Sequence, residues 1–401
     1  MRAFSLIAHD RIDSKLGAWS STMSSCSSTL QSAKSSSNLC PPAVDDGDDK
    51  VLMTVDVCLK ETSSAPYPEV KARVAELLAS QQLRFGNAQL NFLSASHDGY
   101  LDQHVKSINL VCERANHPAI QEGTKLLFWQ VEFAIYVFQL CAEGPADSED
   151  SEDGISAYRE FELPAREFHG LWESLIYDEA VKQRLVTYAA TALYFSDRQV
   201  DQQLIAFNRT VLLHGPAGTG KTSLCKALAQ HLSVRFQYRY RHAQLIEVNA
   251  HSLFSKYFSE SGKLVGRLFA RIQEQVEEKD TLVFVLIDEV ESLTSARQSA
   301  VAGNEPADAI RAVNALLTQL DALKAHTNVM VLTTSNITEA IDLAFLDRAD
   351  IKAFIGPPSW QARYEILRSC ITELQAKSVL EGHFKALPPF AEAMATCVLQ
   401  V

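Results

Sequence analysis

Residues 215–222 read Gly-Pro-Ala-Gly-Thr-Gly-Lys-Thr, and this octapeptide decides the fold class of the chain. It follows an apolar run at 210–213 and precedes a helical pattern at 222–232. A glycine-rich turn between a strand and a helix lets backbone N–H groups wrap a phosphate, and the helix N-terminus adds a favourable dipole. The stretch therefore predicts a phosphate-binding loop in an α/β domain.

The residue types in the loop suggest how the phosphates would be held. Lys221 would reach the β- and γ-phosphates, and the Thr222 hydroxyl would ligate Mg²⁺. The backbone of the other loop residues would surround the phosphates; these residues are Gly215, Pro216, Ala217, Gly218, Thr219 and Gly220.

A second apolar run, 283–287, ends in the carboxylate pair Asp288-Glu289. Mg²⁺ needs an acidic ligand at the end of a strand beside the phosphate loop, and Asp288 fits that role. Glu289 would then polarise the attacking water as a general base. Taken with the loop, the pair predicts hydrolysis of a nucleoside triphosphate.

Two further polar positions leave alternatives open. Asn336 ends the run 331–335 and could orient the lytic water, or it could form a turn or a cap. Arg348 precedes the run 351–355 and could offer its guanidinium to a phosphate bound by a neighbouring subunit. From spacing alone, an ordinary surface salt bridge is the favoured interpretation of Arg348.

Short apolar runs alternate with helical patterns from residue 163 onward. The runs are 210–213, 245–248, 282–287, 329–333 and 351–355. Strands that are apolar on both faces and separated by helices are typical of a parallel sheet with helices on each side.

The part before residue 160 has a different character. Strand patterns at 51–59, 105–112 and 128–137 flank a helical pattern that carries Val70, Val74, Leu77 and Leu78, which predicts a small α+β unit. Residues 1–48 are rich in serine and favour a disordered tail. The acidic stretch 143–154 favours a surface loop.

Composition excludes several classes of protein. A length of 401 residues suggests two or three domains, and a net charge of −12 argues against a broad surface for nucleic acid. No apolar run reaches the roughly 18 residues of a membrane span. Basic and aromatic residues interleave at 235–242, which could contact nucleic acid, but a pore edge or a subunit contact is the favoured interpretation.

These motifs together resemble an AAA+ ATPase. Four longer strings narrow the resemblance to the pachytene checkpoint protein 2 family, ring-shaped remodellers of HORMA-domain proteins. They are AREFHGLW at 165–172, LFSKYFSESGKLV at 253–265, VFVLIDEVESLT at 283–294 and TSNITEAIDLAFLDRADIKAFIGPP at 334–358.

The resemblance implies the organisation and the activity. The domains would be a tail at 1–48, an α+β docking domain at 49–160, a large ATPase domain at 161–356 and a short helical lid at 357–401. The protein would be a homo-hexamer that uses ATP and Mg²⁺ to remodel HORMA-domain proteins, bound directly or through an adaptor, in meiotic chromosome-axis and spindle-checkpoint control. It would work in the nucleus and cytoplasm, without direct contact to nucleic acid or membrane.

The resemblance also implies roles for single residues. Asn336 would sense the γ-phosphate, and Arg348 would act in trans, which raises that interpretation above the salt bridge. Phe168, His169 and Trp172 would line the adenine pocket, although packing also explains Phe168 and Trp172. Pore loops would contain Lys256, Tyr257 and Phe258, for which a buried aromatic staple is the alternative, and Gly303, for which an ordinary turn is the alternative.

One segment departs from the family pattern. The family's lid carries a sensor arginine, and His383 stands at that position here. A neutral imidazole does not replace a permanent guanidinium charge. The second hypothesis is therefore a nucleotide-binding adaptor or regulatory isoform that does not hydrolyse ATP. A DNA-handling AAA+ protein ranks third.

Overall fold

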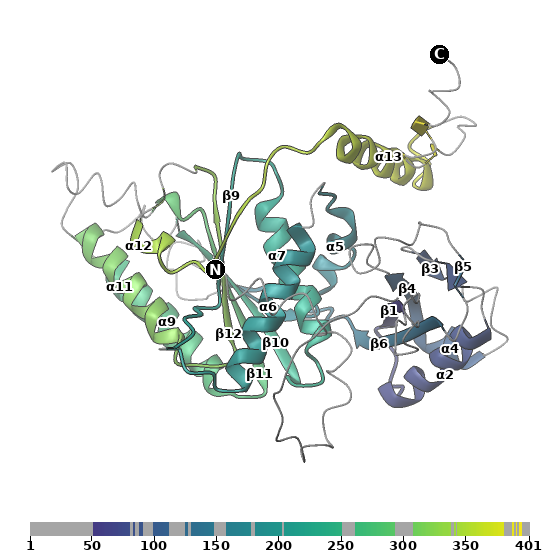
Figure 1. The fold of residues 1–401 in the computed structure, drawn as a ribbon, viewed down its shortest axis with the longest axis horizontal. Helices are drawn as coiled ribbons and strands as arrows, with labels where there is room; N and C mark the ends of the chain where they lie inside the picture. The colour runs from purple at the N-terminus through teal and green to yellow at the C-terminus, as the bar shows by residue number, and fades with distance from the viewer. Residues whose placement is uncertain are drawn as a thin grey trace, which may run out of the picture. The chain divides into compact units, whose positions relative to one another are not determined.

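The computed structural model describes most of the chain from Val51 onward. The described residues are 51–80, 83–84, 88–90, 99–111, 125–126, 130–147, 158–177, 181–202, 204–250, 261–292, 308–337, 341, 343–380, 387–388, 390 and 393–394. The chain divides into two compact units, residues 1–138 and 139–401 (Figure 1). Each unit has a hydrophobic core of its own.

The first unit is a small α+β fold, as the sequence predicts. Its four-stranded sheet has the order β3-β4-β1-β6, and β4 runs antiparallel to both β1 and β3. The elements are β1 (Val51–Leu59), α2 (Tyr67–Ser80), β3 (Ala88–Leu90), α4 (Gly99–His104), β4 (Val105–Val111) and β6 (Val131–Gln139), with a separate pair of β2 (Leu83–Arg84) and β5 (Lys125–Leu126). The apolar face predicted for α2 is buried in this core through Val70, Val74, Leu77 and Leu78.

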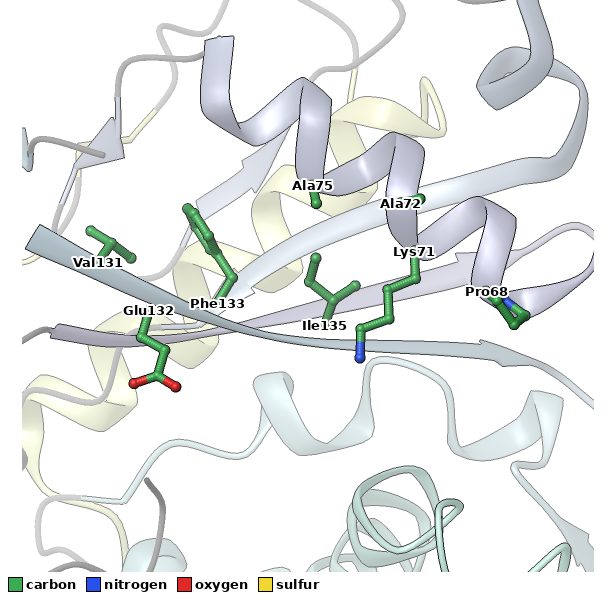
Figure 2. A pocket seen from close by; sticks show the side chains of 8 residues that line it. All are labelled: Pro68, Lys71, Ala72, Ala75, Val131, Glu132, Phe133 and Ile135. Atoms are coloured by element: carbon green, nitrogen blue, oxygen red, sulfur yellow. The ribbon is translucent and has the colours of Figure 1, made fainter. Parts of the chain in front are cut away.

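A groove of about 730 Å³ opens between α2 and β6 (Figure 2). The helix lines it with Pro68, Lys71, Ala72 and Ala75, and the strand with Val131, Glu132, Phe133 and Ile135. Among the described strands, β6 lies at the end of its sheet. The groove is therefore a partly apolar depression with one basic and one acidic side chain in its walls.

The second unit is built on a seven-stranded sheet with the order β13-β9-β12-β11-β10-β8-β7. Its strands are β7 (Ala146–Asp147), β8 (Tyr158–Leu163), β9 (Thr210–His214), β10 (His242–Asn249), β11 (Thr281–Asp288), β12 (Val329–Ser335) and β13 (Ile351–Phe354). The five strands from β13 to β10 are parallel, which confirms the predicted parallel sheet. The remaining two, β8 and β7, add an antiparallel edge that the sequence did not predict.

Helices cover both faces of this sheet (Figure 1). The bounds of these helices are η2 (Arg166–Phe168), α5 (Leu171–Ser174), α6 (Val181–Asp197), α7 (Lys221–Arg235), α9 (Ser261–Glu277), α11 (Asp308–Leu323) and α12 (Leu343–Leu346), and a further helix, α13 (Trp360–Ala376), follows the sheet in the chain. Leu282, Phe284 and Leu286 of β11 pack in the core with α6 and α7, whereas Val283, Val285 and Ile287 pack in the core with α9 and α11. Burial on both faces explains why the strand reads as an unbroken apolar run.

The boundary between the two units falls after residue 138, which is earlier in the chain than the predicted division between 49–160 and 161–356. Strand β8 pairs with β10, with Phe161 opposite Leu245, and it buries Phe161 and Leu163 in the core that α7 covers. The acidic stretch 143–154, predicted as a loop, contributes the short strand β7 to the same sheet. Residues 139–160 therefore belong with the second unit.

Within the described ranges, none of the helices combines the length and the apolar character that crossing a bilayer requires. Helix α13 lies at the start of the segment 357–401, for which the resemblance implies a short helical lid. His383 lies outside the described residues.

Candidate active site

Three neighbouring parallel strands bring the predicted catalytic residues to one edge of the sheet. Strand β12 lies between β9 and β11. Because parallel strands end at the same edge, the loop after β9, the polar end of β12 and Asp288 of β11 are adjacent there. The predicted combination of phosphate loop and carboxylates therefore forms one site.

The phosphate loop requires glycine for steric reasons. Gly215 has a φ of 146°, and a Cβ added to it would lie 2.2 Å from the carbonyl oxygen of Ile355. Its N–H donates to the Ser335 carbonyl at 3.2 Å, so the loop starts between the ends of β12 and β13. Gly218 and Gly220 have φ angles of 78° and 85°, which residues with a Cβ rarely adopt.

Lys221 begins α7 and is buried, with 5% of its surface exposed. Its ammonium donates to the carbonyl oxygens of Gly215 at 2.9 Å and Pro216 at 2.8 Å. Burial lowers the pKa of Lys221, although the carboxylates of Glu291, Asp288 and Glu289 act in the opposite direction. The lysine is thus held inside the loop that the phosphates would enter.

Asp288 and Thr222 provide the oxygen atoms of the predicted metal site. The Thr222 hydroxyl donates to Asp288 Oδ1 at 2.9 Å, and the Thr334 hydroxyl donates to the same oxygen. Mg²⁺ takes oxygen ligands, and a hydroxyl beside a carboxylate in a phosphate site meets that preference. Thr222 and Asp288 therefore fit the ion.

Glu289 leaves the strand in an unusual conformation. Its φ is 59°, in the left-handed region that residues other than glycine rarely adopt, and its side chain is exposed. Two hydrogen bonds hold this turn: the Glu289 N–H donates to Thr334 Oγ1 at 3.2 Å, and the Val290 N–H donates to the Thr334 carbonyl at 3.0 Å. The turn leaves the Glu289 side chain open to solvent at the carboxyl edge of the sheet.

Asn336 follows β12, the strand between the loop and the carboxylates. Its backbone N–H donates to Glu291 Oε1 at 3.1 Å, and its side chain is partly exposed. This position is compatible with the predicted contact to a water or a γ-phosphate.

Sequence reasoning missed three residues of this site. Thr334 links β12 to the Asp288 carboxylate and to the backbone N–H of Glu289 through the contacts given above. The Tyr177 hydroxyl lies 3.5 Å and 3.4 Å from the carbonyl oxygens of Thr219 and Gly220, and the side chain of Leu175 also approaches Gly220. Burial raises the pKa of Tyr177 to about 12, so its hydroxyl remains a donor. A threonine in a strand and a tyrosine in a loop carry no motif that could have identified them.

The residues predicted to line an adenine pocket differ in burial and in their neighbours. Phe168 is buried in the core against Phe161, with ring centroids 5.0 Å apart, so the packing alternative describes its side chain. Trp172 stacks on His231 at 4.5 Å, and His169 is exposed. The segment after α5, which carries Leu175 and Tyr177, contacts the phosphate loop.

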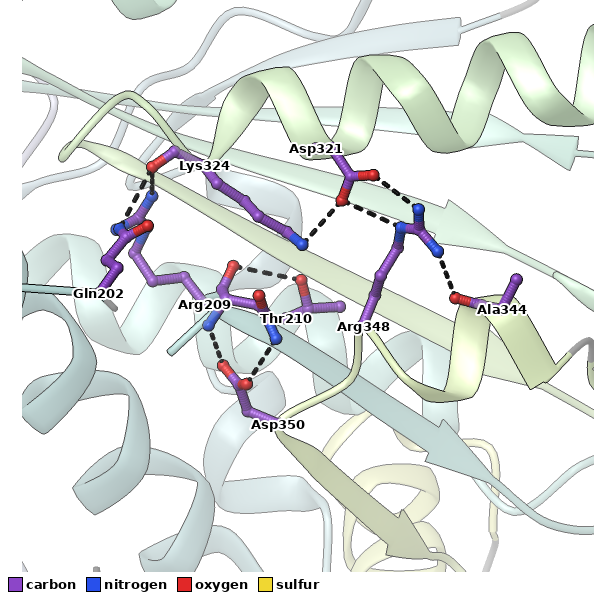
Figure 3. Close-up of polar contacts among 9 residues, drawn as sticks. Gln202, Arg209, Thr210, Asp321, Lys324, Ala344, Arg348 and Asp350 are labelled. Carbon is purple, nitrogen blue, oxygen red and sulfur yellow. Dashed lines mark hydrogen bonds and ion pairs between the residues drawn. The ribbon is translucent and has the colours of Figure 1, made fainter. Parts of the chain in front are cut away.

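Arg348 lies away from the phosphate loop of its own chain. It precedes β13, and the N–H of Asp350 nearby donates to the carbonyl of Thr210 at the start of β9. The loop follows the other end of β9, five residues or about 17 Å along the strand. Arg348 pairs with Asp321 within the chain, Nε to Oδ1 at 3.0 Å and Nη2 to Oδ2 at 2.6 Å (Figure 3), which is the salt bridge that spacing alone favoured.

The basic and aromatic residues at 235–242 do not form one continuous surface. Phe236 and Tyr240 are buried, and Arg239 pairs with Asp197 at 3.3 Å. Of the aromatic residues, Tyr238 is well exposed. The segment joins α7 to the amino end of β10, at the sheet edge opposite the phosphate loop. The predicted pore residues Lys256, Tyr257, Phe258 and Gly303 lie outside the described residues.

Comparisons with known proteins match both units. Residues 211–357 match the model of the ATPase family associated with various cellular activities (AAA), and residues 48–143 match the model of the TRIP13 N-terminal domain. The pachytene checkpoint protein 2 homolog of Oryza sativa subsp. indica is 55% identical over 344 residues, which is 85% of this chain and 71% of that protein. The Homo sapiens homolog is 48% identical over 328 residues, 81% of this chain and 74% of that protein. The structure of PCH-2 from C. elegans has a TM-score of 0.65 at 36% identity and covers 83% of this chain and 80% of that one.

Proposed function

Because this chain belongs to the pachytene checkpoint protein 2 family of AAA+ ATPases, we propose that it uses ATP hydrolysis to remodel HORMA-domain proteins. The remodelling would serve meiotic chromosome-axis and spindle-checkpoint control in the nucleus and cytoplasm. The observation that carries the hydrolysis step is the cluster of Lys221, Thr222, Asp288 and Thr334 at one sheet edge.

Each residue of the site has its own role in ATP hydrolysis. Lys221 would exchange its contacts with the Gly215 and Pro216 carbonyls for the β- and γ-phosphates, and Thr222 and Asp288 would hold Mg²⁺. When bound, Mg²⁺ neutralises charge that develops on the phosphate oxygens. Glu289 takes a proton from the attacking water.

Thr334 and Asn336 position these groups. Thr334 fixes the Asp288 carboxylate and the backbone of Glu289, so the two acidic side chains keep a defined relation to each other. Asn336 contacts the water or the γ-phosphate from the middle strand. Arg348 completes a site on a neighbouring chain of a homo-hexamer, which is consistent with its place at the opposite edge of the sheet from its own loop.

The N-terminal unit docks the substrate or its adaptor. Its separate core and its match to the TRIP13 N-terminal domain support this role, as does the partly apolar groove between α2 and β6 (Figure 2). The segments around Tyr257 and Gly303 act on the substrate as pore loops.

Replacing Glu289 tests the hydrolysis step. Glu289→Gln removes the base and keeps the shape of the side chain, so we expect nucleotide binding with a dissociation constant close to that of the native chain and a loss of turnover of at least about 100-fold. Nucleotide titration and phosphate release measure the two quantities. Glu274→Gln, on the exposed surface of α9, is the matched control and should leave turnover unchanged.

Native turnover in Glu289→Gln would contradict the assigned base. A native chain that binds ATP without releasing phosphate would favour the second hypothesis, an adaptor that does not hydrolyse ATP. Failure of the active native chain to convert a HORMA-domain protein would contradict the proposed substrate.

A further inference from the structure

The guanidinium of Arg348 is held on two of its sides (Figure 3). Asp321 accepts from Nε at 3.0 Å and from Nη2 at 2.6 Å, and the Ala344 carbonyl accepts from Nη1 at 2.6 Å. A guanidinium has five N–H donors. Three are used in this way, which leaves one on each terminal nitrogen.

The two remaining N–H donors of Arg348 belong to its two terminal nitrogens, Nη1 and Nη2. Asp321 occupies the side that contains Nε, and the Ala344 carbonyl lies back toward the Arg348 backbone (Figure 3), so the remaining N–H of Nη1 and that of Nη2 lie side by side at the end of the guanidinium. Such a pair matches two oxygens of a phosphate group. A quarter of the Arg348 side chain is exposed, so this side chain reaches the surface of the chain.

Asp321 is itself fixed to the body of the sheet. The Lys324 ammonium lies 2.7 Å from Asp321 Oδ1, and the Lys324 carbonyl accepts from Arg209 Nη2 at 2.7 Å. Arg209 is almost fully buried and also donates to the carbonyls of Val329 and His326 and to the hydroxyl of Ser196. The contacts therefore run from the core through Lys324 and Asp321 to Arg348.

The ionisation of Asp321 supports a permanent contact. Burial raises the pKa of this carboxyl group, but the hydrogen bonds from Arg348 and Lys324, together with their charges, outweigh burial and hold the pKa below its usual range. Asp321 is therefore a carboxylate at neutral pH.

We propose that Asp321 is a positioning residue that orients the Arg348 guanidinium so that its two end-on donors face a phosphate bound by a neighbouring chain. The inference rests on the proposed function, in which Arg348 acts in trans. The opposite arrangement, in which Asp321 withholds Arg348 from the phosphate, would require the carboxylate to occupy the end-on donors. It occupies the side instead, which favours orientation.

Asp321→Asn tests the role because it keeps the shape and removes the charge and one acceptor. We expect a roughly tenfold lower kcat for ATP hydrolysis and little change in KM, because the phosphate loop that binds ATP is distant. Arg348→Ala should lower kcat further, and the double variant should be no slower than Arg348→Ala alone. A residue with only a structural role would add its own loss to that of Arg348→Ala.

A mixing experiment separates the two chains that share a site. Chains with Arg348→Ala keep the phosphate loop, and chains with Lys221→Ala keep Arg348, so a mixture of the two should recover hydrolysis. Adding Asp321→Asn to the Lys221→Ala chain should lower the recovery about tenfold, whereas adding it to the Arg348→Ala chain should have no effect. Glu274→Gln, from the exposed ion pair with Arg271, is the matched control.

The outcomes are distinguishable. Native activity in Arg348→Ala would overturn the role in trans and the inference with it. Loss in Arg348→Ala together with full recovery from the Lys221→Ala, Asp321→Asn chain would overturn the role of Asp321 alone. A faster Asp321→Asn chain would show that the carboxylate restrains Arg348, which also overturns the proposal.

Discussion

Two alanine substitutions in the phosphate loop should differ greatly in effect. Gly215→Ala places a Cβ 2.2 Å from the Ile355 carbonyl oxygen, and relieving that contact requires a movement of about 1 Å. Ile355 is restrained because its own N–H donates to the His214 carbonyl at 2.8 Å. In Gly218→Ala the new Cβ meets no atom within 4 Å, so only the strain of a φ of 78° remains.

The expected magnitudes follow from these two situations. Left-handed backbone costs a residue with a Cβ about 1–2 kcal/mol. At Gly215 the loss of the restraining hydrogen bond and the shift of the strand end add to that strain, for a total of at least about 3 kcal/mol. If ATP binding requires the native loop, 3 kcal/mol corresponds to about 150-fold weaker binding for Gly215→Ala, and 1–2 kcal/mol to roughly 5–30-fold for Gly218→Ala.

Titration of a fluorescent ATP analogue into each variant measures the difference. The Glu289→Gln background prevents hydrolysis during the titration, and circular dichroism controls for folding. Equal losses for both variants, or binding of Gly215→Ala within threefold of the parent, would refute the steric argument.

Two further predictions concern stability. Arg209→Met leaves the acceptors at Val329, Lys324, His326 and Ser196 without their buried donor, so we expect about 3–5 kcal/mol less stability in urea unfolding, against less than about 1 kcal/mol for the partly exposed control Arg239→Met. Similar midpoints for the two would contradict the structural role of Arg209. His231 should make stability fall with acid: burial and the charges of Arg235 and Lys182 hold its pKa well below 6.5, so below pH 6.5 the unfolded chain binds a proton that the folded chain does not. His231→Phe keeps a ring against Trp172 and should flatten the decline by up to about 1.4 kcal/mol per pH unit, whereas the exposed control His169→Phe should not; an unchanged slope in His231→Phe would contradict this account.

The parallel sheet could be predicted because its strands are buried on both faces. Continuous apolar runs such as 282–287 are a local property of the sequence, and β11 extends that run by only one residue at each end. Strand β8 could not be predicted in the same way. Its sequence YREFEL contains three charged residues, and its place in the sheet depends on pairing with β10, which lies about 80 residues further along the chain.

The site was predictable where a motif fixes it locally. That Lys221, Thr222, Asp288 and Glu289 come together could be predicted because each belongs to a short pattern with a known chemical role. The contacts of Thr334 depend on the register between β12 and neighbouring β11, and those of Asp321 depend on how α11 approaches the turn before β13. Contacts between residues far apart in the sequence cannot be predicted from a local sequence pattern.

If Arg348 acts on a neighbouring chain, as proposed above, its distance from its own phosphate loop constrains how chains can associate. The loop lies after the carboxyl end of β9 and Arg348 lies near its amino end, so two different faces of the chain meet when one chain completes the site of the next. Such an interface is heterologous, and each added chain again presents an unsatisfied face until rotation brings the last chain back to the first. In that assembly each site would need Arg348 from one particular neighbour. Loss of a single chain would therefore inactivate the site next to the gap.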